Sequence, residues 1–138
     1  MTETPIIDSA QIHSLLAGHG YEVEHLAPNV LSIRQTESGI TVQAVLEGDI
    51  LFFSLVCLTV GDSALTAPVL RGMLADDNEI STSHFQIYSV GEGRSAIALS
   101  NFCKLQTLGP DDEDDILSCV DFLLADVLAA RDLLKDLA

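Results

Sequence analysis

The stretch DDEDDILSCVDFLLADVLAARDLLKDL, residues 111–137, decides the fold. It opens with consecutive acids and then places apolar residues alternately four and three positions apart, which is the period of one helix face. These positions are Ile116, Val120, Leu123, Val127, Ala130, Leu134 and Leu137, and Leu117, Leu124 and Leu128 widen the face. The acids stand where a helix dipole favours negative charge, and Arg131 and Lys135 stand near the opposite end. We therefore predict a C-terminal helix over Asp112–Leu137 that covers a sheet.

The residues before this helix show strand and helix patterns in turn. Asp8, with Gln11 three positions later, predicts a capped first helix that Gly18 ends. Tyr21–Pro28 alternates weakly and is compatible with either a short edge strand or an extended lead-in. Five strands are predicted at Val30–Gln35, Ile40–Leu46, Ile50–Val60, His84–Ser89 and Ser95–Leu105, and a second helix at Leu65–Ala75.

This order of elements predicts an α+β fold in a single domain, residues 1–138. The order is helix, three strands, helix, two strands, helix. The strands are separated by short turns rich in glycine and acids, so neighbouring strands are expected to run antiparallel. We expect two layers, a five-stranded, mainly antiparallel sheet and a layer of helices.

Charge limits the partners that the chain can bind. It has 21 Asp and Glu against six Lys and Arg, a formal net charge of −15, although 48% of its residues are hydrophobic. Such a surface repels nucleic acid and anionic lipid, because binding to either needs Lys and Arg. We expect no nucleic-acid binding, no membrane insertion, and a protein partner of basic or apolar character.

The N-terminus and the cysteines predict a cytoplasmic protein. Met1–Ala10 carries no basic residue, so no signal peptide is expected, and the longest apolar run is too short to span a bilayer. Cys57, Cys103 and Cys119 are odd in number and lack C-x-x-C spacing. This pattern favours buried free thiols over a disulfide framework or a zinc site.

No motif for catalysis, cofactor binding or metal binding is found. The candidate bases are His13, His19, His25 and His84, and none has the H-E-x-x-H spacing of a zinc hydrolase. The acids Asp111–Asp115 lack the alternation and central glycine of a calcium loop, so helix capping and solvated charge explain them better. We predict no catalytic, cofactor-binding or metal residues, no cofactor, and no enzymatic activity.

Two segments are more apolar than one core needs. Ile50–Val60 is apolar on both faces of a strand, and Leu65–Ala75 is apolar around much of a helix. Either the other helices cover this surface, or it contacts a second copy or a protein partner. We favour the second interpretation, with contacts at Phe53, Leu55, Leu65, Val69, Leu70 and Met73.

The order of these elements in a short acidic chain resembles the type III secretion chaperone fold. The meander ending near Val60, the middle helix Leu65–Ala75, the hairpin His84–Leu105 and the C-terminal helix have counterparts in it. YbjN-like proteins are bacterial relatives of that fold, and the chain most resembles the small YjfI-like family associated with phage-shock-protein-A-like partners. The resemblance rests on topology, size and acidity, and it implies a non-enzymatic homodimer that holds or regulates another protein.

Two hypotheses about function follow. The first is a chaperone-like or regulatory protein-binding module, whose partner uses an exposed sheet edge or an apolar groove. The alternative is a small-molecule-binding or enzymatic α+β domain with a pocket between sheet and helices. That alternative requires His13, His84 and carboxylates to converge in a deep pocket.

Overall fold

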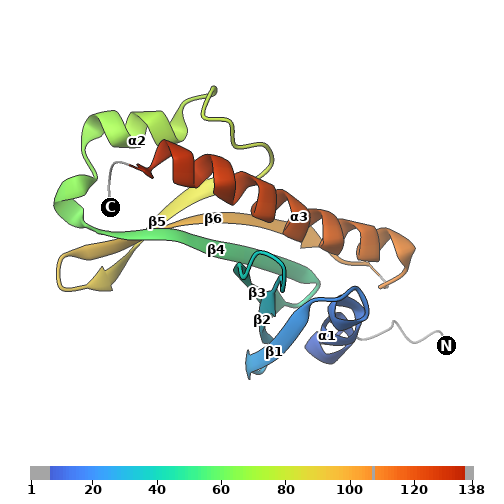
Figure 1. Ribbon diagram of the computed structural model, residues 1–138. Coiled ribbons are helices and arrows are strands. Elements are labelled where there is room, and N and C mark those ends of the chain that lie inside the picture. The colour runs from blue at the N-terminus through green and yellow to red at the C-terminus, as the bar shows by residue number, and fades with distance from the viewer. Residues whose placement is uncertain (1–6, 107, 136–138) are drawn as a thin grey trace. The chain divides into compact units, whose positions relative to one another are not determined.

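The computed structural model describes residues 7–106 and 108–135, which form a six-stranded antiparallel sheet and three α-helices (Figure 1). The α+β class predicted from the sequence is confirmed. The strands lie in the order β1-β2-β3-β4-β6-β5. The elements are α1 (Ser9–Gly18), β1 (Glu22–Ala27), β2 (Val30–Arg34), β3 (Thr41–Glu47), β4 (Ile50–Gly61), the 3-10 turn η1 (Asp62–Ala64), α2 (Ala67–Leu74), β5 (His84–Gly91), β6 (Arg94–Lys104) and α3 (Pro110–Leu133).

The prediction of five strands is wrong, because Glu22–Ala27 forms an additional edge strand, β1. It pairs antiparallel with β2 across a tight turn at Pro28 and Asn29, where Asn29 adopts a φ of 64°. Only Val23 of β1 is half-buried, and the rest of the strand is exposed. The strand therefore presents almost no apolar face, which explains why the alternation of Tyr21–Pro28 was too weak to decide between the two readings.

The described residues cluster into two compact units. The first contains Met1–Phe53 and Phe102–Val120, and the second contains Ser54–Asn101 and Asp121–Ala138. Strands β4 and β6 and helix α3 each contribute one part to either unit. The single domain over residues 1–138 stays a prediction.

In the first unit, helix α1 packs against β1 and β2 (Figure 1). The capping box predicted at its start is present: Asp8 and Gln11 each accept a hydrogen bond from the other's backbone N–H at 2.9 Å. Alternate residues of β2 and β3 point into the core, as expected for strands with one covered face. The largest fully buried side chains of this unit are Ile12, Leu16, Leu31, Ile33, Val42, Leu51, Phe53, Leu105 and Ile116.

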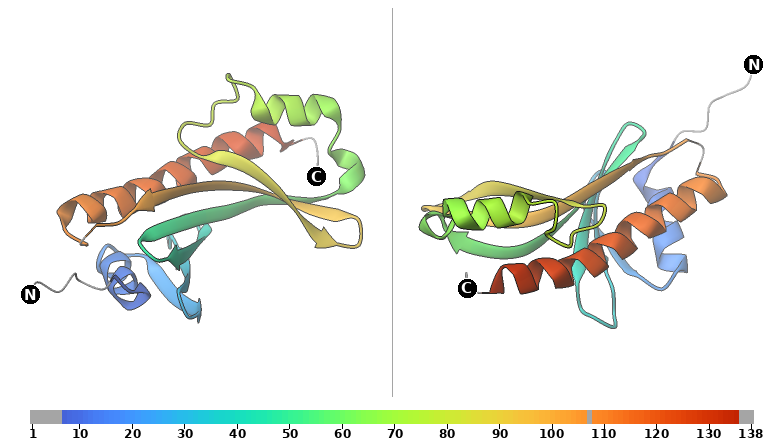
Figure 2. Two further views of the ribbon diagram at one scale, coloured as in Figure 1. Left: turned by 180° about the vertical axis from the view of Figure 1, so that it is seen from behind. Right: turned by 90° about the horizontal axis from the view of Figure 1, so that it is seen from above.

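In the second unit, α2 and the C-terminal half of α3 lie on the same face of β4, β5 and β6 (Figures 1 and 2). Val60 of β4, Met73 of α2, Ile97 of β6 and Leu134 form one buried cluster. Helix α2 begins at Ala67, two residues later than predicted, because η1 occupies the preceding turn. The residues Cys57, Leu58, Ala64, Leu65, Val69, Leu70 and Phe85 pack around that cluster and are half-buried.

Helix α3 has the apolar seam that its sequence predicts. Ile116, Val120, Leu123, Val127, Ala130 and Leu134 are all buried. The wider face is only partly confirmed, because Leu128 is 62% exposed while Leu117 and Leu124 are half-buried. The predicted end at Leu137 lies outside the described residues.

Candidate functional site

The strand β5 forms one edge of the sheet and is exposed along nearly its whole length. It pairs antiparallel with β6, with Ile87 opposite Ile97 and Tyr88 opposite Ala96. Because successive side chains of a strand point to opposite faces, Ile87 and Tyr88 belong to different faces of the sheet. Ile87 is 39% exposed, Tyr88 46% and Val90 51%. We call these three residues the β5 edge, and all three are apolar and exposed.

Strand β5 lacks charged residues and proline, which usually protect a sheet edge, and its one protective feature is a β-bulge between Ser89 and Gly91, near its C-terminal end. Its sequence, HFQIYSVG, contains no Lys, no Arg, no Pro and no acid. The regular part of the strand, before the bulge, is exposed and uncharged, and it is a template for pairing with another strand. Acidic residues stand at both of its ends, in the preceding loop (Asp76, Asp77 and Glu79) and in the following turn (Glu92). The chain segments that precede and follow β5 are therefore both acidic.

The first unit carries a second exposed apolar surface. Phe52 of β4 and Phe102 of β6 lie with their ring centroids 6.0 Å apart and their planes tilted by 42°. Phe52 is 39% exposed and Phe102 is 60% exposed. We call these two residues the aromatic pair. Paired aromatic rings on the open face of a sheet are typical of a contact surface.

The residues predicted as contacts lie elsewhere. Phe53, Leu55 and Met73 are buried in the chain's own core. Leu65, Val69 and Leu70 are half-buried against the cluster of Val60 and Met73. The strand Ile50–Val60 does have an open face, but it carries Phe52 and Val56, the neighbours of the residues that were named. The role of Leu65, Val69 and Leu70 in a dimer or partner contact stays a prediction.

The histidines do not gather at one site. His25 Nδ1 lies 3.1 Å from His13 Nδ1, and its Nε2 lies 3.1 Å from Ser9 Oγ. His19 Nε2 lies 2.5 Å from a carboxylate oxygen of Glu113. These groups belong to the first unit, whereas His84 starts β5 in the second. His13 and His84, which the enzymatic alternative requires in one pocket, thus belong to different units.

The structure reveals two buried carboxylates. Both belong to α3, and both accept hydrogen bonds from loops. Asp126 is 4% exposed and accepts from the backbone N–H of Ser81 at 3.0 Å, the Ser81 hydroxyl at 2.9 Å and the backbone N–H of Ser83 at 3.3 Å. Asp112 is 3% exposed and accepts from the backbone N–H groups of Gln106 and Leu108 at 2.8 and 2.7 Å. These carboxylates therefore fix the loops that precede β5 and α3.

Cys57, Cys103 and Cys119 are reduced thiols that differ in acidity. Burial raises the pKa of Cys57 to about 11, although Arg131 opposes the change. In the first unit, Cys103 and Cys119 share a hydrogen bond. This bond, together with burial, raises the pKa of Cys103. The same bond lowers the pKa of Cys119, against the opposing effects of burial and Asp115. Cys119 is thus the most acidic of the three thiols.

This order of acidity predicts an order of alkylation. At pH 8 we expect iodoacetamide to modify Cys119 about tenfold faster than Cys57, because its larger thiolate fraction outweighs the lower nucleophilicity of a more acidic thiol. Cys103, which is buried, should react last. Peptide mass spectrometry over a time course measures all three rates. Faster modification of Cys57 than of Cys119 would contradict the assignment.

In residues 7–106 and 108–135, no group of three or more His, Cys, Asp or Glu residues is placed to hold a metal ion. Among the helices of these same residues, none combines the length and the apolar character that a membrane crossing requires.

Comparison with solved structures gives a match over almost the whole chain. The crystal structure of YbjN from E. coli, a proposed transcription regulator, superposes with a TM-score of 0.70. The two chains are 11% identical, and the match covers 96% of this chain and 97% of that one. The chain shares its fold with YbjN. At this identity the likeness establishes the fold and not the role. No protein-family model and no curated protein sequence matches the chain.

Proposed function

We propose that the chain is a non-enzymatic protein-binding module, a regulator or adaptor that takes up an extended segment of a partner along β5. The observation that carries this proposal is the β5 edge, which is uncharged, apolar and exposed. Strand addition of this kind gains affinity from main-chain hydrogen bonds and specificity from alternate side chains. Ile87 on one face and Tyr88 on the other give the incoming strand apolar neighbours on both sides of the sheet, and Val90 lies at the β-bulge before Gly91.

Charge specifies the partner further. The acids at Asp76, Asp77, Glu79 and Glu92 flank β5, and the whole chain has a formal net charge of −15. A partner segment with apolar residues in its middle and Lys or Arg at its ends complements this arrangement. Such a segment also associates faster, because the field of the acidic chain attracts it.

The shared fold with YbjN, whose role is proposed to be regulatory, supports an adaptor or regulator over an enzyme. The resemblance to the YjfI-like family adds a specific candidate, a partner related to phage-shock protein A. A chaperone-like function is a form of the same proposal in which the partner is incompletely folded, because β5 receives an extended segment.

Photo-cross-linking from the edge tests the proposal. We expect a benzophenone amino acid in place of Tyr88, expressed in the native host, to cross-link to a discrete protein through an extended, basic-flanked segment. The matched control places the same amino acid at Leu74, an apolar residue of α2 that is 78% exposed but lies outside β5. Equal cross-linking from both positions would contradict the proposed binding along β5. Cross-linking from position 88 to a second copy of the chain alone would also contradict it.

The aromatic pair supports self-association. Two copies of this chain repel one another through their net charge, so a contact between copies is favoured where the surface is neutral and apolar. Phe52 and Phe102 form such a surface, and the nearby Lys104 lies 3.9 Å from Asp49, which balances the local charge. The chain therefore forms a homodimer through this pair and leaves β5 available for the partner.

The dimer can be tested by replacing one ring with a charge. Phe102→Asp should weaken self-association about a hundredfold or more, because it buries a carboxylate in an apolar contact. Sedimentation at several concentrations measures the effect, and added salt should strengthen the wild-type dimer by screening the repulsion. The control is Phe122→Asp on α3, where the side chain is 42% exposed. A wild-type chain that is monomeric at high micromolar concentration would contradict the proposed dimer.

The enzymatic alternative has less support. The side chains of Ser9, His25 and His13 lie in a row of polar contacts that resembles a nucleophile with its base, but His25 is exposed. A hollow of about 370 Å³ lies over β1, β2 and β3, and Arg34 inside it is bonded to Glu22 at 2.9 Å. The residues that line it are Glu22, Val23, Glu24, Ser32, Arg34 and Thr41, none of which belongs to the histidine chain. Positioning of a substrate against a buried base is thus not supported.

A further inference from the structure

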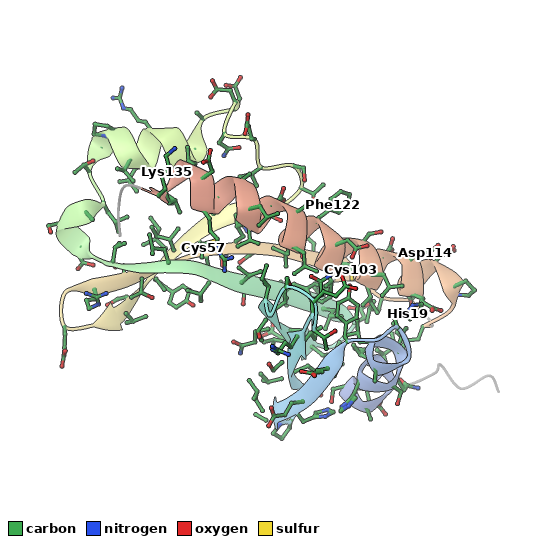
Figure 3. All side chains as sticks on the ribbon, in the orientation of Figure 1. His19, Cys57, Cys103, Asp114, Phe122 and Lys135 are labelled. Carbon is green, nitrogen blue, oxygen red and sulfur yellow. The ribbon has the colours of Figure 1, made fainter. Side chains whose placement is uncertain are left out.

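The second unit contains a cavity of about 270 Å³ next to the end of α3. It is lined by Cys57 and Leu58 of β4 and by Arg131, Leu134 and Lys135. Figure 3 labels Cys57 and Lys135, which come from the strand and from the end of the helix. The cavity thus has an apolar part, from three side chains, and a cationic part, from two.

The apolar part of the cavity contains no group that needs a hydrogen bond from a ligand. Leu134 is buried and belongs to the cluster of Val60 and Met73, and Leu58 packs against that cluster. Burial raises the pKa of Cys57 to about 11, so the thiol is neutral at physiological pH. Its proton points to the carbonyl oxygen of Leu55, 3.9 Å away. Alkyl groups can therefore replace water here without leaving a polar group unsatisfied.

The cationic part concentrates a charge that is scarce in this chain. Only six Lys and Arg residues are present against 21 acids, and two of the six line this one cavity. Arg131 and Lys135 are four residues apart, which puts their side chains on one side of the chain's helical end. Lys135 lies 3.7 Å from Asp132, but both side chains are largely exposed, so this pair is weak. In residues 7–106 and 108–135, no carboxylate lies within ion-pair distance of Arg131.

We propose that this cavity binds a small amphiphile with a monoanionic head group, namely a free medium-chain carboxylate. The planar guanidinium of Arg131 can donate two parallel hydrogen bonds to the head group, and Lys135 adds a second cation. The alkyl chain lies against Cys57, Leu58 and Leu134. The proposal is independent of strand addition at β5, because the residues involved are different.

The size of the cavity and the charge of the protein limit the ligand. At about 30 Å³ per non-hydrogen atom, the value for liquid water, the cavity holds roughly nine such atoms. Hexanoate and octanoate are of this size. A net charge of −15 disfavours each further negative charge on a ligand, so a carboxylate is preferred over a dianionic phosphate with the same chain.

Nuclear magnetic resonance titration with sodium octanoate at constant ionic strength tests the proposal. We expect saturable shifts confined to residues around Leu58 and Leu134, with half-saturation at about 1 mM or below, given the few atoms of the ligand. Octan-1-ol and octylammonium should bind at least about tenfold more weakly, because neither offers an anion to Arg131. Octyl phosphate should bind more weakly than octanoate.

Variants that each remove one positive charge test whether octanoate binds at Arg131 and Lys135. Arg131→Gln and Lys135→Gln replace exposed side chains, so both variants should fold, and circular dichroism checks this. Each should weaken octanoate binding, Arg131→Gln by about tenfold or more, since it removes the bidentate partner. Lys104→Gln removes one charge in the first unit, 72% exposed, and should leave binding unchanged. Equal binding of octanol and octanoate, an equal loss in Lys104→Gln, or shifts that do not saturate would each overturn the proposal.

Discussion

Replacing Ile87 and Val90 together by Lys should weaken partner binding at least about a hundredfold and leave the fold intact. Both side chains are exposed, 39% and 51%, so a lysine at either position can extend its ammonium group into solvent. A charged side chain at a sheet edge opposes strand pairing, and lysine here also repels the basic ends expected in the partner segment. Removing two apolar anchors, at about 1.4 kcal/mol or more each, costs about 2.8 kcal/mol or more, and each 1.4 kcal/mol is a tenfold change in the dissociation constant.

The matched control is Leu74→Lys, which makes the same change at an apolar residue that is 78% exposed and lies on α2. The partner that cross-linking identifies is purified, and calorimetry measures its affinity. This affinity should be unchanged in the control. Urea unfolding of both variants checks that they are folded. Unaltered affinity in the double variant would show that the partner does not use β5.

Asp126→Ala should lower the free energy of unfolding by about 3–5 kcal/mol. The carboxylate is 4% exposed and accepts three hydrogen bonds, each worth about 1.5–3 kcal/mol when the acceptor is charged. Alanine leaves the partly buried backbone N–H groups of Ser81 and Ser83 without their acceptor. Since typical domains are stable by about 5–15 kcal/mol, this is a large share of the total.

Two further variants make the Asp126 prediction specific. Asp126→Asn keeps one carbonyl oxygen for Ser81 but turns an N–H group toward Ser83, so its loss should be intermediate. Asp132→Ala removes an exposed carboxylate of the same helix, whose pair with Lys135 is worth less than about 1 kcal/mol. Urea denaturation measures all three. A loss in Asp126→Ala no larger than in Asp132→Ala would contradict a structural role for the buried carboxylate.

The elements of the fold could be predicted from sequence because their patterns are local. The seam of α3 and the capping box of α1 depend on residues three and four apart, and both are present. The face of a strand depends on register, and a shift of one residue exchanges its two faces. An interior run such as Ile50–Val60 is apolar on both faces, so its sequence does not reveal that Phe53 is buried and Phe52 exposed.

The polar sites could not be predicted because they join distant residues. Asp126 is buried by a loop 45 positions earlier, although an Asp next to a helix seam usually faces water. His19 and Glu113 are 94 positions apart, and Cys103 meets Cys119 only because β6 and α3 bring them together. The segment His84–Ser89 was predicted to be a strand, but only the order of strands in the sheet shows that this strand, β5, lies at an edge.

Hydrogen–deuterium exchange of β5, in the free chain and in complex with the captured partner, tests strand addition most directly. An edge strand leaves alternate backbone N–H groups unpaired, and an added strand provides their acceptors. We predict that amides within His84–Gly91 exchange rapidly in the free chain and become strongly protected in the complex, at alternate positions. Protection that appears elsewhere while these amides keep exchanging at their free rate would contradict the account.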